Sequence, residues 1–169
     1  KDISACMCKL KDISGSLKLC SNNGTLDEVE LFEIKGFAIK SLELEKLWTS
    51  LPLSKLIPQI TFKDITSVLK LLDPENKGLP TFFLYDSYSP LLKEIRQRKK
   101  AVEAKLFTCP QEKLEELKNL RLQIVNEELQ EELKIKEELS SRLKTFIEPM
   151  KHNMASIGEL DMLIAKAHI

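Results

Sequence analysis

The sequence predicts an all-α protein with a helical body and a long antiparallel helical arm. Apolar residues recur at steps of three and four along most of the 169 residues, which is the period of an amphipathic helix. Glycine occurs only five times. From Gln111 to Ile147 there is neither glycine nor proline, which permits one helix about 55 Å long at about 1.5 Å per residue. At most one short β hairpin is expected, near 79–86, where bulky and aromatic residues cluster.

The first predicted part is a helical core body over 1–89. A helix is expected over Ile3–Leu19, and Gly24 is expected to end it in the left-handed conformation that glycine adopts readily. Thr25 and Glu28 have the spacing of a capping box, which predicts the start of the next helix.

Two further helix starts are marked by polar residues. A shorter helix is expected over Phe62–Leu72, with Thr61 or Thr66 as its N-cap. Ser89 and Pro90 form a stronger signal, because serine caps a helix and proline at the first helical position loses no needed hydrogen bond. We expect these two residues to open the arm.

The predicted arm spans 90–147, and the predicted return helix to the core spans 148–169. Thr108 and Gln111 are expected to cap the second arm helix, and Pro149 is expected to interrupt it. One stripe of apolar residues is expected to hold this helix in place: Leu122, Val125, Leu129, Leu133, Leu139, Leu143 and Ile147.

The two arm helices carry opposite charge bias. Lys93–Lys105 contains six basic and two acidic residues, whereas Gln111–Glu148 contains ten acidic and seven basic residues. Packed antiparallel, the two helices would attract each other. The whole chain has 26 basic and 26 acidic residues, so its net charge favours neither nucleic acid nor a membrane surface as a partner.

A basic cluster in the first arm helix is a candidate for phosphate contact. Its members are Arg96, Arg98, Lys99, Lys100 and Lys105. The cluster has no interleaved aromatic residue on which a base could stack. Pairing with the acidic strip of the second helix is the competing interpretation, because a DNA role requires Arg98, Lys99 and Lys100 to stay free of that strip.

Signals for catalysis, cofactors and metals are absent from the sequence. There is no phosphate-binding glycine loop, no G-x-S-x-G, no H-E-x-x-H and no C-x-x-C. His152 and His168 are interpreted as solvated helix residues. The paired carboxylates are interpreted as a solvated helix face rather than as acid–base or metal-binding groups: Glu127/Glu128, Glu131/Glu132 and Glu137/Glu138. We therefore predict no catalytic, cofactor-binding or metal-binding residue.

The four cysteines, Cys6, Cys8, Cys20 and Cys109, are expected to be free thiols. Cys6 and Cys8 are too close in sequence for an ordinary bridge within a helix, and no histidine lies near to complete a metal site. Free thiols suit the reducing cytoplasm, and no signal peptide or run of about 20 apolar residues is present. Because the chain starts at Lys1 and ends in a helical pattern, we expect it to be part of a longer polypeptide.

Three segments resemble the MutS family. The run Asp86-Ser87-Tyr88-Ser89-Pro90-Leu91-Leu92-Lys93-Glu94-Ile95-Arg96 resembles the D-x-x-S/D-P-x-L-x-x-I/L-R run that opens the first lever helix of that family's core domain. The segment 158–167 resembles the L-D-x-L-x-A-x-A segment where the second lever returns to the body, and 30–35 looks like the core helix before the levers. The resemblance covers most of the chain from about Thr25 onward, in matching order.

The resemblance implies a non-catalytic core and lever domain. Such a domain mechanically couples an ATPase domain, which this sequence does not contain, to DNA contact in mismatch repair or recombination control. ATP and magnesium are implied for that ATPase domain only, and the implied partners are double-stranded or branched DNA, the ATPase domain and a second copy in a homodimer. The family's β-rich clamp is missing or reduced to a helical tip, since only about 107–126 remains for it. The implied structural residues are Asp86, Ser89, Pro90, Ile95, Leu129, Leu133, Leu143, Leu160 and Leu163.

The alternative is a helical coiled-coil module that binds a partner protein through the apolar stripe and has no nucleic-acid role. One observation would distinguish the two interpretations. If the residues that follow Ile169 contained a strand and then a G-x-x-x-x-G-K-S/T loop, the MutS-like interpretation would be favoured.

Overall fold

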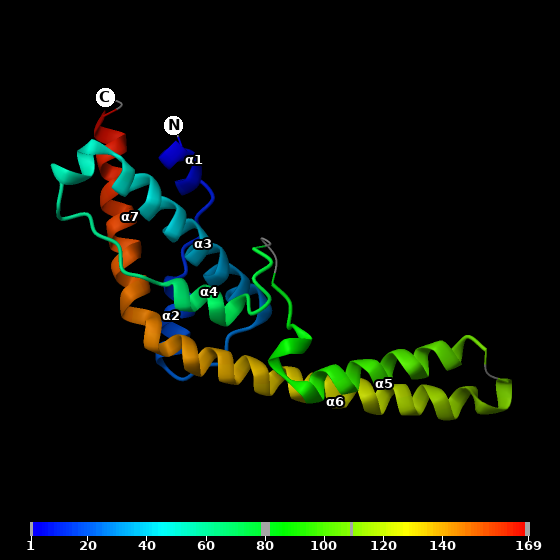
Figure 1. Ribbon diagram of the computed structural model, residues 1–169. Helices are drawn as coiled ribbons and strands as arrows, with labels where there is room; N and C mark the ends of the chain where they lie inside the picture. Colours follow the sequence, from blue (N-terminus) through cyan, green and yellow to red (C-terminus); the bar gives the residue numbers. More distant parts are fainter. Residues whose placement is uncertain (1, 79–81, 109, 168–169) are drawn as a thin grey trace. The chain divides into compact units, whose positions relative to one another are not determined.

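The computed structural model describes residues 2–78, 82–108 and 110–167, and this part of the chain is all-α, with no strand. It divides into two compact units. Unit 1 consists of Lys1–Phe82 and Leu139–Ile169, and unit 2 of Phe83–Glu138. Unit 2 thus starts before residue 90, where the predicted arm begins, and ends before residue 147, where the predicted arm ends. Figure 1 names the helices.

Unit 1 begins with two short helices, α1 (Asp2–Met7) and α2 (Ser14–Ser21). The prediction of one helix over Ile3–Leu19 is therefore wrong. The side chain of Asp12 accepts a hydrogen bond from the Ser14 amide at 2.9 Å. This local side-chain bond lies directly before α2 and helps to set the residue at which the second helix starts.

The turn after α2 also differs from the prediction. Asn23, and not Gly24, has the positive φ of 61°. Space is tight at Gly24, because a Cβ there would lie 2.3 Å from Leu19 Cδ1 and 3.0 Å from the Leu19 carbonyl oxygen. The next helix, α3 (Glu28–Ser50), is capped by Asp27 in a capping box with Glu30, not by the predicted Thr25 with Glu28.

Helix α3 is the central helix of unit 1, where it contacts α1, α4 (Thr66–Leu72) and α7 (Ile147–Ala167). Its buried side chains line one long face: Leu31, Ile34, Phe37, Ala38, Leu44 and Trp48. Between α3 and α4 lies one 3-10 turn, η1 (Pro52–Lys55). The prediction that α4 starts at Phe62 with a threonine cap is wrong, because Asp64 accepts from the Thr66 amide at 2.8 Å and starts the helix four residues later.

The end of unit 1 consists of a 3-10 turn, η3 (Lys144–Phe146), followed directly by α7. The predicted interruption of the helix lies at η3, a few residues earlier than expected, and Pro149 lies within the first turn of α7. Proline is tolerated there because the first amides of a helix have no intrahelical acceptor. Buried Asn153 ties α7 to the rest of the unit, since its side chain bonds Ser41 Oγ and both backbone groups of Lys63.

Unit 2 contains a 3-10 turn, η2 (Asp86–Tyr88), the helix α5 (Pro90–Leu106) and most of α6 (Gln111–Leu143). The predicted start of α5 is confirmed: Ser89 Oγ accepts from the Leu92 amide and Pro90 is the first helical residue. The β hairpin predicted near 79–86 does not form over 82–86, and 79–81 lie outside the described residues. The Thr108 hydroxyl donates to Lys105 O at 3.4 Å, so it closes α5 and does not cap α6.

Candidate functional site on the α5–α6 helix pair

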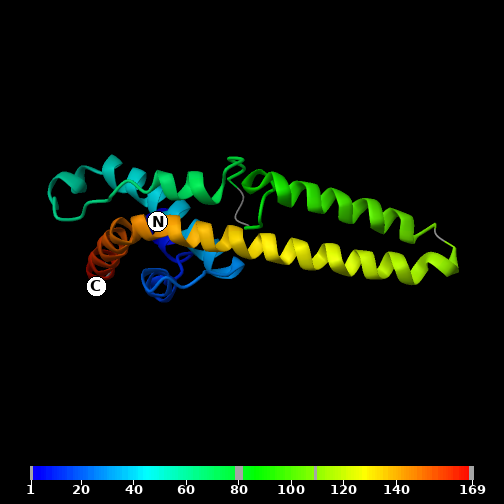
Figure 2. The same ribbon diagram turned by 90° about the horizontal axis from the view of Figure 1, so that it is seen from below.

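Helices α5 and α6 lie side by side in unit 2, as both Figure 1 and Figure 2 show. Two ion pairs define their register. Arg121 Nε lies 2.9 Å from Glu103 Oε1, and Arg98 Nη1 lies 2.8 Å from Glu127 Oε2. Residue numbers fall along α5 as they rise along α6, so the two helices pack antiparallel over this stretch.

Arg96 is the centre of the charged contacts between these helices. Its Nη1 donates to Leu84 O and to Asp86 Oδ1, both at 2.7 Å. Its Nε donates to Glu128 Oε1 at 3.1 Å and its Nη2 to Glu132 Oε1 at 2.9 Å. One guanidinium thus ties the segment before α5 to α6, using the fork of donors that only arginine has.

Two further contacts surround this centre. Ser89 Oγ donates to Glu131 Oε1 at 2.7 Å, and Lys99 Nζ donates to Glu128. Burial raises the pKa of the Glu128 carboxyl, but the hydrogen bonds from Lys99 and Arg96 outweigh it and hold the pKa below its ordinary value. For Arg96, burial lowers the pKa, and the bonds to Asp86, Glu132 and Glu128 raise it above its ordinary value. Glu128 and Arg96 therefore both carry charge at neutral pH.

The apolar seam of the pair is short. Ile95, Val102 and Ile124 form its buried cluster, with Leu117 half-buried beside them. Leu129 and Leu133, which were predicted to hold the arm, are 56% and 42% exposed. The prediction is wrong because the side of α6 that faces α5 carries Ile124, Glu128 and Ile135. Leu122, Leu129 and Leu133 lie about 100–140° around the helix from Glu128, at about 100° per residue.

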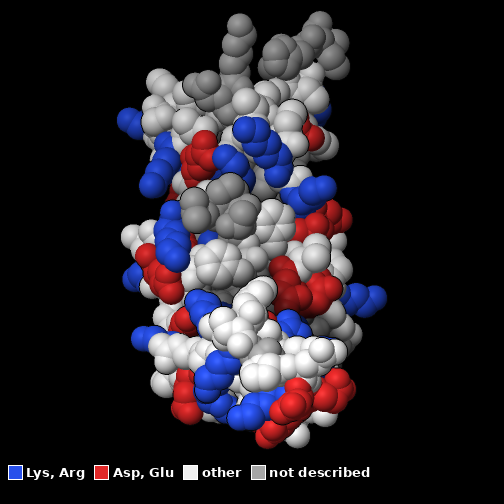
Figure 3. Space-filling view, turned by 90° about the vertical axis from the view of Figure 1, so that its right-hand side faces the viewer, with Lys and Arg blue, Asp and Glu red and all other residues white. Residues whose placement is uncertain are grey.

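Of the five phosphate-contact candidates, three are engaged by carboxylates. Arg96 and Lys99 bond Glu128, and Arg98 bonds Glu127. The condition that Arg98, Lys99 and Lys100 stay free of the acidic strip is therefore not met. Lys100 and Lys105 are exposed and have no ion-pair partner in the described part of the chain. Figure 3 shows basic and acidic side chains intermixed over the face in view, without a continuous basic area.

The remaining predicted structural residues lie in the core of unit 1. Leu143 is fully buried and Leu160 is 2% exposed. Leu160 packs in one cluster with Trp48 and Ile60, and Leu163 is half-buried against it. Trp48 Nε1 donates to Ile60 O at 3.1 Å, which holds the indole in this cluster.

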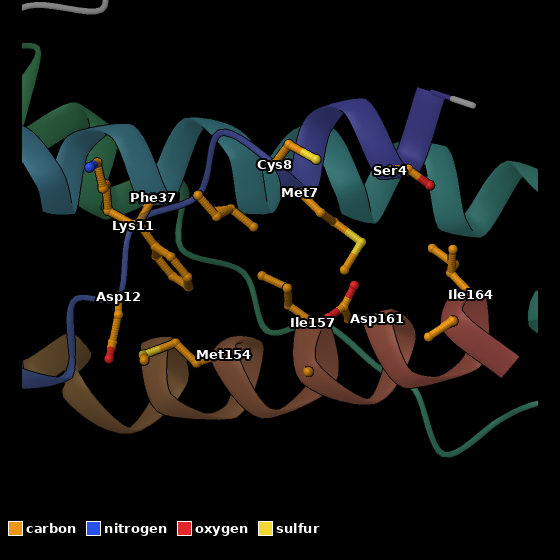
Figure 4. Close-up of a pocket in the computed structure, with 13 residues that line it drawn as sticks. Ser4, Met7, Cys8, Lys11, Asp12, Phe37, Met154, Ile157, Asp161 and Ile164 are labelled. Carbon is orange, nitrogen blue, oxygen red and sulfur yellow. The ribbon is translucent and has the colours of Figure 1, made fainter.

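Unit 1 also contains a hollow of about 580 Å³ that the sequence did not indicate. In Figure 4 the side chains of Met7, Phe37 and Ile157 point into the space between α1, α3 and α7. Lys11 and Asp161 also line it, but no His, Ser or Cys lies hydrogen-bonded to a base in it. Its walls come from distant parts of the chain, so no local pattern could have predicted it.

No group of three or more His, Cys, Asp or Glu side chains in the described ranges is arranged to hold a metal ion. His152 Nε2 lies 3.0 Å from both the Thr61 hydroxyl and the Thr61 carbonyl oxygen, so this histidine is a structural contact of unit 1. His168 and Cys109 lie outside the described residues. Cys6, Cys8 and Cys20 are free, and burial raises the pKa of the Cys6 and Cys20 thiols.

None of the described helices combines the length and the apolar character needed to cross a bilayer. No protein-family model matches the chain, and no curated protein matches it. Fold and contacts define the class of this molecule as an all-α protein with an ion-paired helix pair in its second unit.

Proposed function

We propose that the chain is the non-catalytic core and lever domain of a MutS-like protein. It would mechanically couple an ATPase domain, where ATP and magnesium bind, to double-stranded or branched DNA, in mismatch repair or recombination control. The parent protein would act in the cytoplasm as a homodimer, and the free thiols of Cys6, Cys8 and Cys20 suit that compartment.

One observation carries this proposal: the residues of the MutS-like run are those that build the start of α5. Asp86 and Arg96 bond each other at 2.7 Å, Ser89 caps the helix and Pro90 is its first residue. The apolar position Ile95 is 2% exposed and lies in the seam with α6. Because fixed positions of this motif contact one another, the resemblance has better support than a match of residue spacing alone would give.

The helix α6 has the property that a lever needs. It runs without interruption for 33 residues, and it contributes residues 111–138 to unit 2 and 139–143 to unit 1. A continuous hydrogen-bonded helix moves as a rigid body, so a displacement at one end reaches the other. Only residues 107–110 separate α5 from α6, which is in keeping with the expectation that the family's β-rich clamp is missing or reduced here.

DNA contact is tested on Lys100, which projects from α5 without an ion-pair partner in the described chain. Lys99 is unsuitable because its reversal would also break the contact with Glu128. Lys100→Glu should lower the affinity for a labelled blunt duplex severalfold and reduce the salt slope by about 0.9, the contribution of one phosphate contact.

The matched control is Lys46→Glu, which makes the same charge change at an exposed position of unit 1. Fluorescence anisotropy over a salt series measures both variants, and circular dichroism checks their helicity. Absence of duplex and branched-DNA binding at low salt, or equal losses in both variants, would contradict the proposed DNA contact.

A coiled-coil interaction module is the second candidate, and one observation favours it. Leu122, Leu129 and Leu133 are 59%, 56% and 42% exposed on one face of α6. If the chain is such a module, substituting Leu129 by serine should abolish capture of a partner protein and leave DNA binding unchanged. The MutS-like proposal predicts instead that DNA binding depends on Lys100.

A further inference from the structure

The hollow of about 580 Å³ in unit 1 lies between α1, α3 and α7, and most of the side chains that line it are apolar. The lining residues of α7 have the spacing of one helix face: Met154, Ile157, Gly158, Asp161, Ile164 and Ala165. Met7 and Leu10 line the hollow from α1 and the residues after it, and the buried ring of Phe37 lines it from α3. The volume falls within the range of about 300–1,000 Å³ that is typical of small-molecule sites.

Gly158 leaves space in this hollow from the middle of α7. A Cβ at this position would meet no neighbouring side chain or loop atom within 4 Å in the described structure. Glycine is, after proline, the residue that a helix interior tolerates least. The helix therefore gives up stability at Gly158 although a larger residue would fit, and the hollow stays open there.

One carboxylate of the hollow has no cation beside it. In Figure 4 the side chain of Asp161 points from α7 toward Met7 of α1, and it has no ion-pair partner in the described ranges. Lys11, the one cation among the described lining residues, points away from α7 in the same view. The other carboxylate, Asp12, accepts hydrogen bonds from the amide and the hydroxyl of Ser14. An apolar hollow with one unpaired carboxylate favours a ligand that joins an apolar body to a positive charge.

We propose that this hollow binds a small amphiphilic amine, a molecule with an apolar body and a protonated amino group. The apolar body lies along the face of α7 between α1 and α3, and the amino group pairs with Asp161. Met7 and Met154 suit ligands of different shapes, because unbranched thioether side chains adapt to what they contact. A fatty acid fits less well, because its carboxylate would face Asp161. This inference goes beyond the proposed coupling to DNA and does not rest on it.

The first test varies the head group and keeps the apolar chain constant. Octylamine, octanol and octanoate are titrated into the full 169-residue chain at pH 7 by calorimetry, each below its micellar concentration. Protonated octylamine should bind about threefold more tightly than octanol, and octanoate about threefold more weakly, because a solvated ion pair contributes modestly. Hexylamine should bind about tenfold more weakly than octylamine, because two buried methylenes are lost.

The matched variants of this test lie on one helix. Asp161→Asn should bring the affinities for the three eight-carbon probes together. Glu159→Gln removes a carboxylate from an exposed position of α7 that does not line the hollow, and it should leave the order of affinities unchanged.

The second test locates the bound amine. The chain has four methionines, whose ¹³C-labelled methyl groups report separately by NMR. Met7 and Met154 line the hollow, whereas the buried Met150 and the exposed Met162 do not. Octylamine should shift the methyl signals of Met7 and Met154 with one saturation curve and leave the other two in place.

The third test fills the hollow. Gly158→Leu should weaken octylamine and octanol alike by more than about tenfold and keep the helix, because leucine is a better helix former than glycine. Gly36→Leu is the matched control, since Gly36 also has open space at its Cβ but lies in α3 outside the lining. Circular dichroism checks the helicity of both variants.

Several results would overturn the proposed site: no saturable binding of octylamine, equal affinities for octylamine and octanoate, or equal losses in Gly158→Leu and Gly36→Leu. A methyl shift of Met162 as large as that of Met7 would also overturn it, because the amine would then adsorb without a site. Self-association of the chain that Gly158→Leu abolishes would assign the hollow to a second copy instead of an amine. None of these results bears on DNA binding, which Lys100 tests separately.

Discussion

Arg96 is the residue on which the polar contacts of unit 2 converge. Its guanidinium joins Leu84 O and Asp86, on the segment before α5, to Glu128 and Glu132 on α6. The guanidinium is only 24% exposed. Removing it would take from Glu128 one of its two cations and from Glu132 its ion-pair partner, and because both carboxylates are partly buried the penalty exceeds the loss of an exposed ion pair.

Arg96→Gln should therefore lower the free energy of unfolding by about 2 kcal/mol, less than a fully buried pair because the site is partly solvated. Arg98→Gln is the control on the same helix, since its pair with Glu127 is nearly half exposed on both sides. The control should change the free energy by about 0.5 kcal/mol or less. Urea denaturation followed by circular dichroism measures both, and equal losses would show that Arg96 is no more than a surface pair.

Ser89→Ala tests the helix start. The hydroxyl accepts from the Leu92 amide and donates to Glu131, so its loss should cost about 1 kcal/mol of stability. Ser141→Ala, at an exposed position of α6, should cost nothing, because alanine is the better helix former. The two variants are compared by thermal unfolding, and an unchanged midpoint for Ser89→Ala would refute the role of the cap.

The contact between α5 and α6 combines a short apolar seam with a row of ion pairs. The side of α6 that faces α5 carries Glu128 between Ile124 and Ile135. Sequence periodicity could not choose this side, since α6 has a second apolar row at Leu122, Leu129 and Leu133. Charge bias predicted that the helices attract, but only the structure shows which carboxylates receive which cations.

The depressed pKa of Glu128 gives this pairing a pH dependence. The ordinary pKa of glutamate is about 4.3. Because the folded value lies lower, the carboxylate stabilises the fold fully above about pH 4.3 and progressively less as the pH falls through the folded pKa. Stability should therefore drop as the pH falls below about 4.3.

Glu128→Gln should flatten this acid limb, whereas Glu127→Gln, at the neighbouring exposed position, should leave it in place. The free energy of unfolding is measured by urea denaturation at a series of pH values. An acid limb of equal slope in the wild type and in Glu128→Gln would show that the acid sensitivity arises elsewhere.

At the scale of the whole molecule, the fold class and the strongest helix start were predictable from the sequence, because they depend on local signals. The all-α character follows from periodicity, and the start of α5 follows from Ser89 and Pro90. Boundaries failed where one residue offered the backbone an alternative bond, as Asp12 does before α2 and Asp64 before α4. The hollow between α1, α3 and α7 was missed because its walls come from distant parts of the chain.

The central claim is that this chain is the core and lever domain of a MutS-like ATPase. Determining the coding sequence that follows the codon for Ile169 tests it most directly. The account predicts a β-strand followed by G-x-x-x-x-G-K-S/T, the loop that cradles nucleotide phosphates. A continuing sequence that contains no such loop would contradict the claim and favour the interaction module.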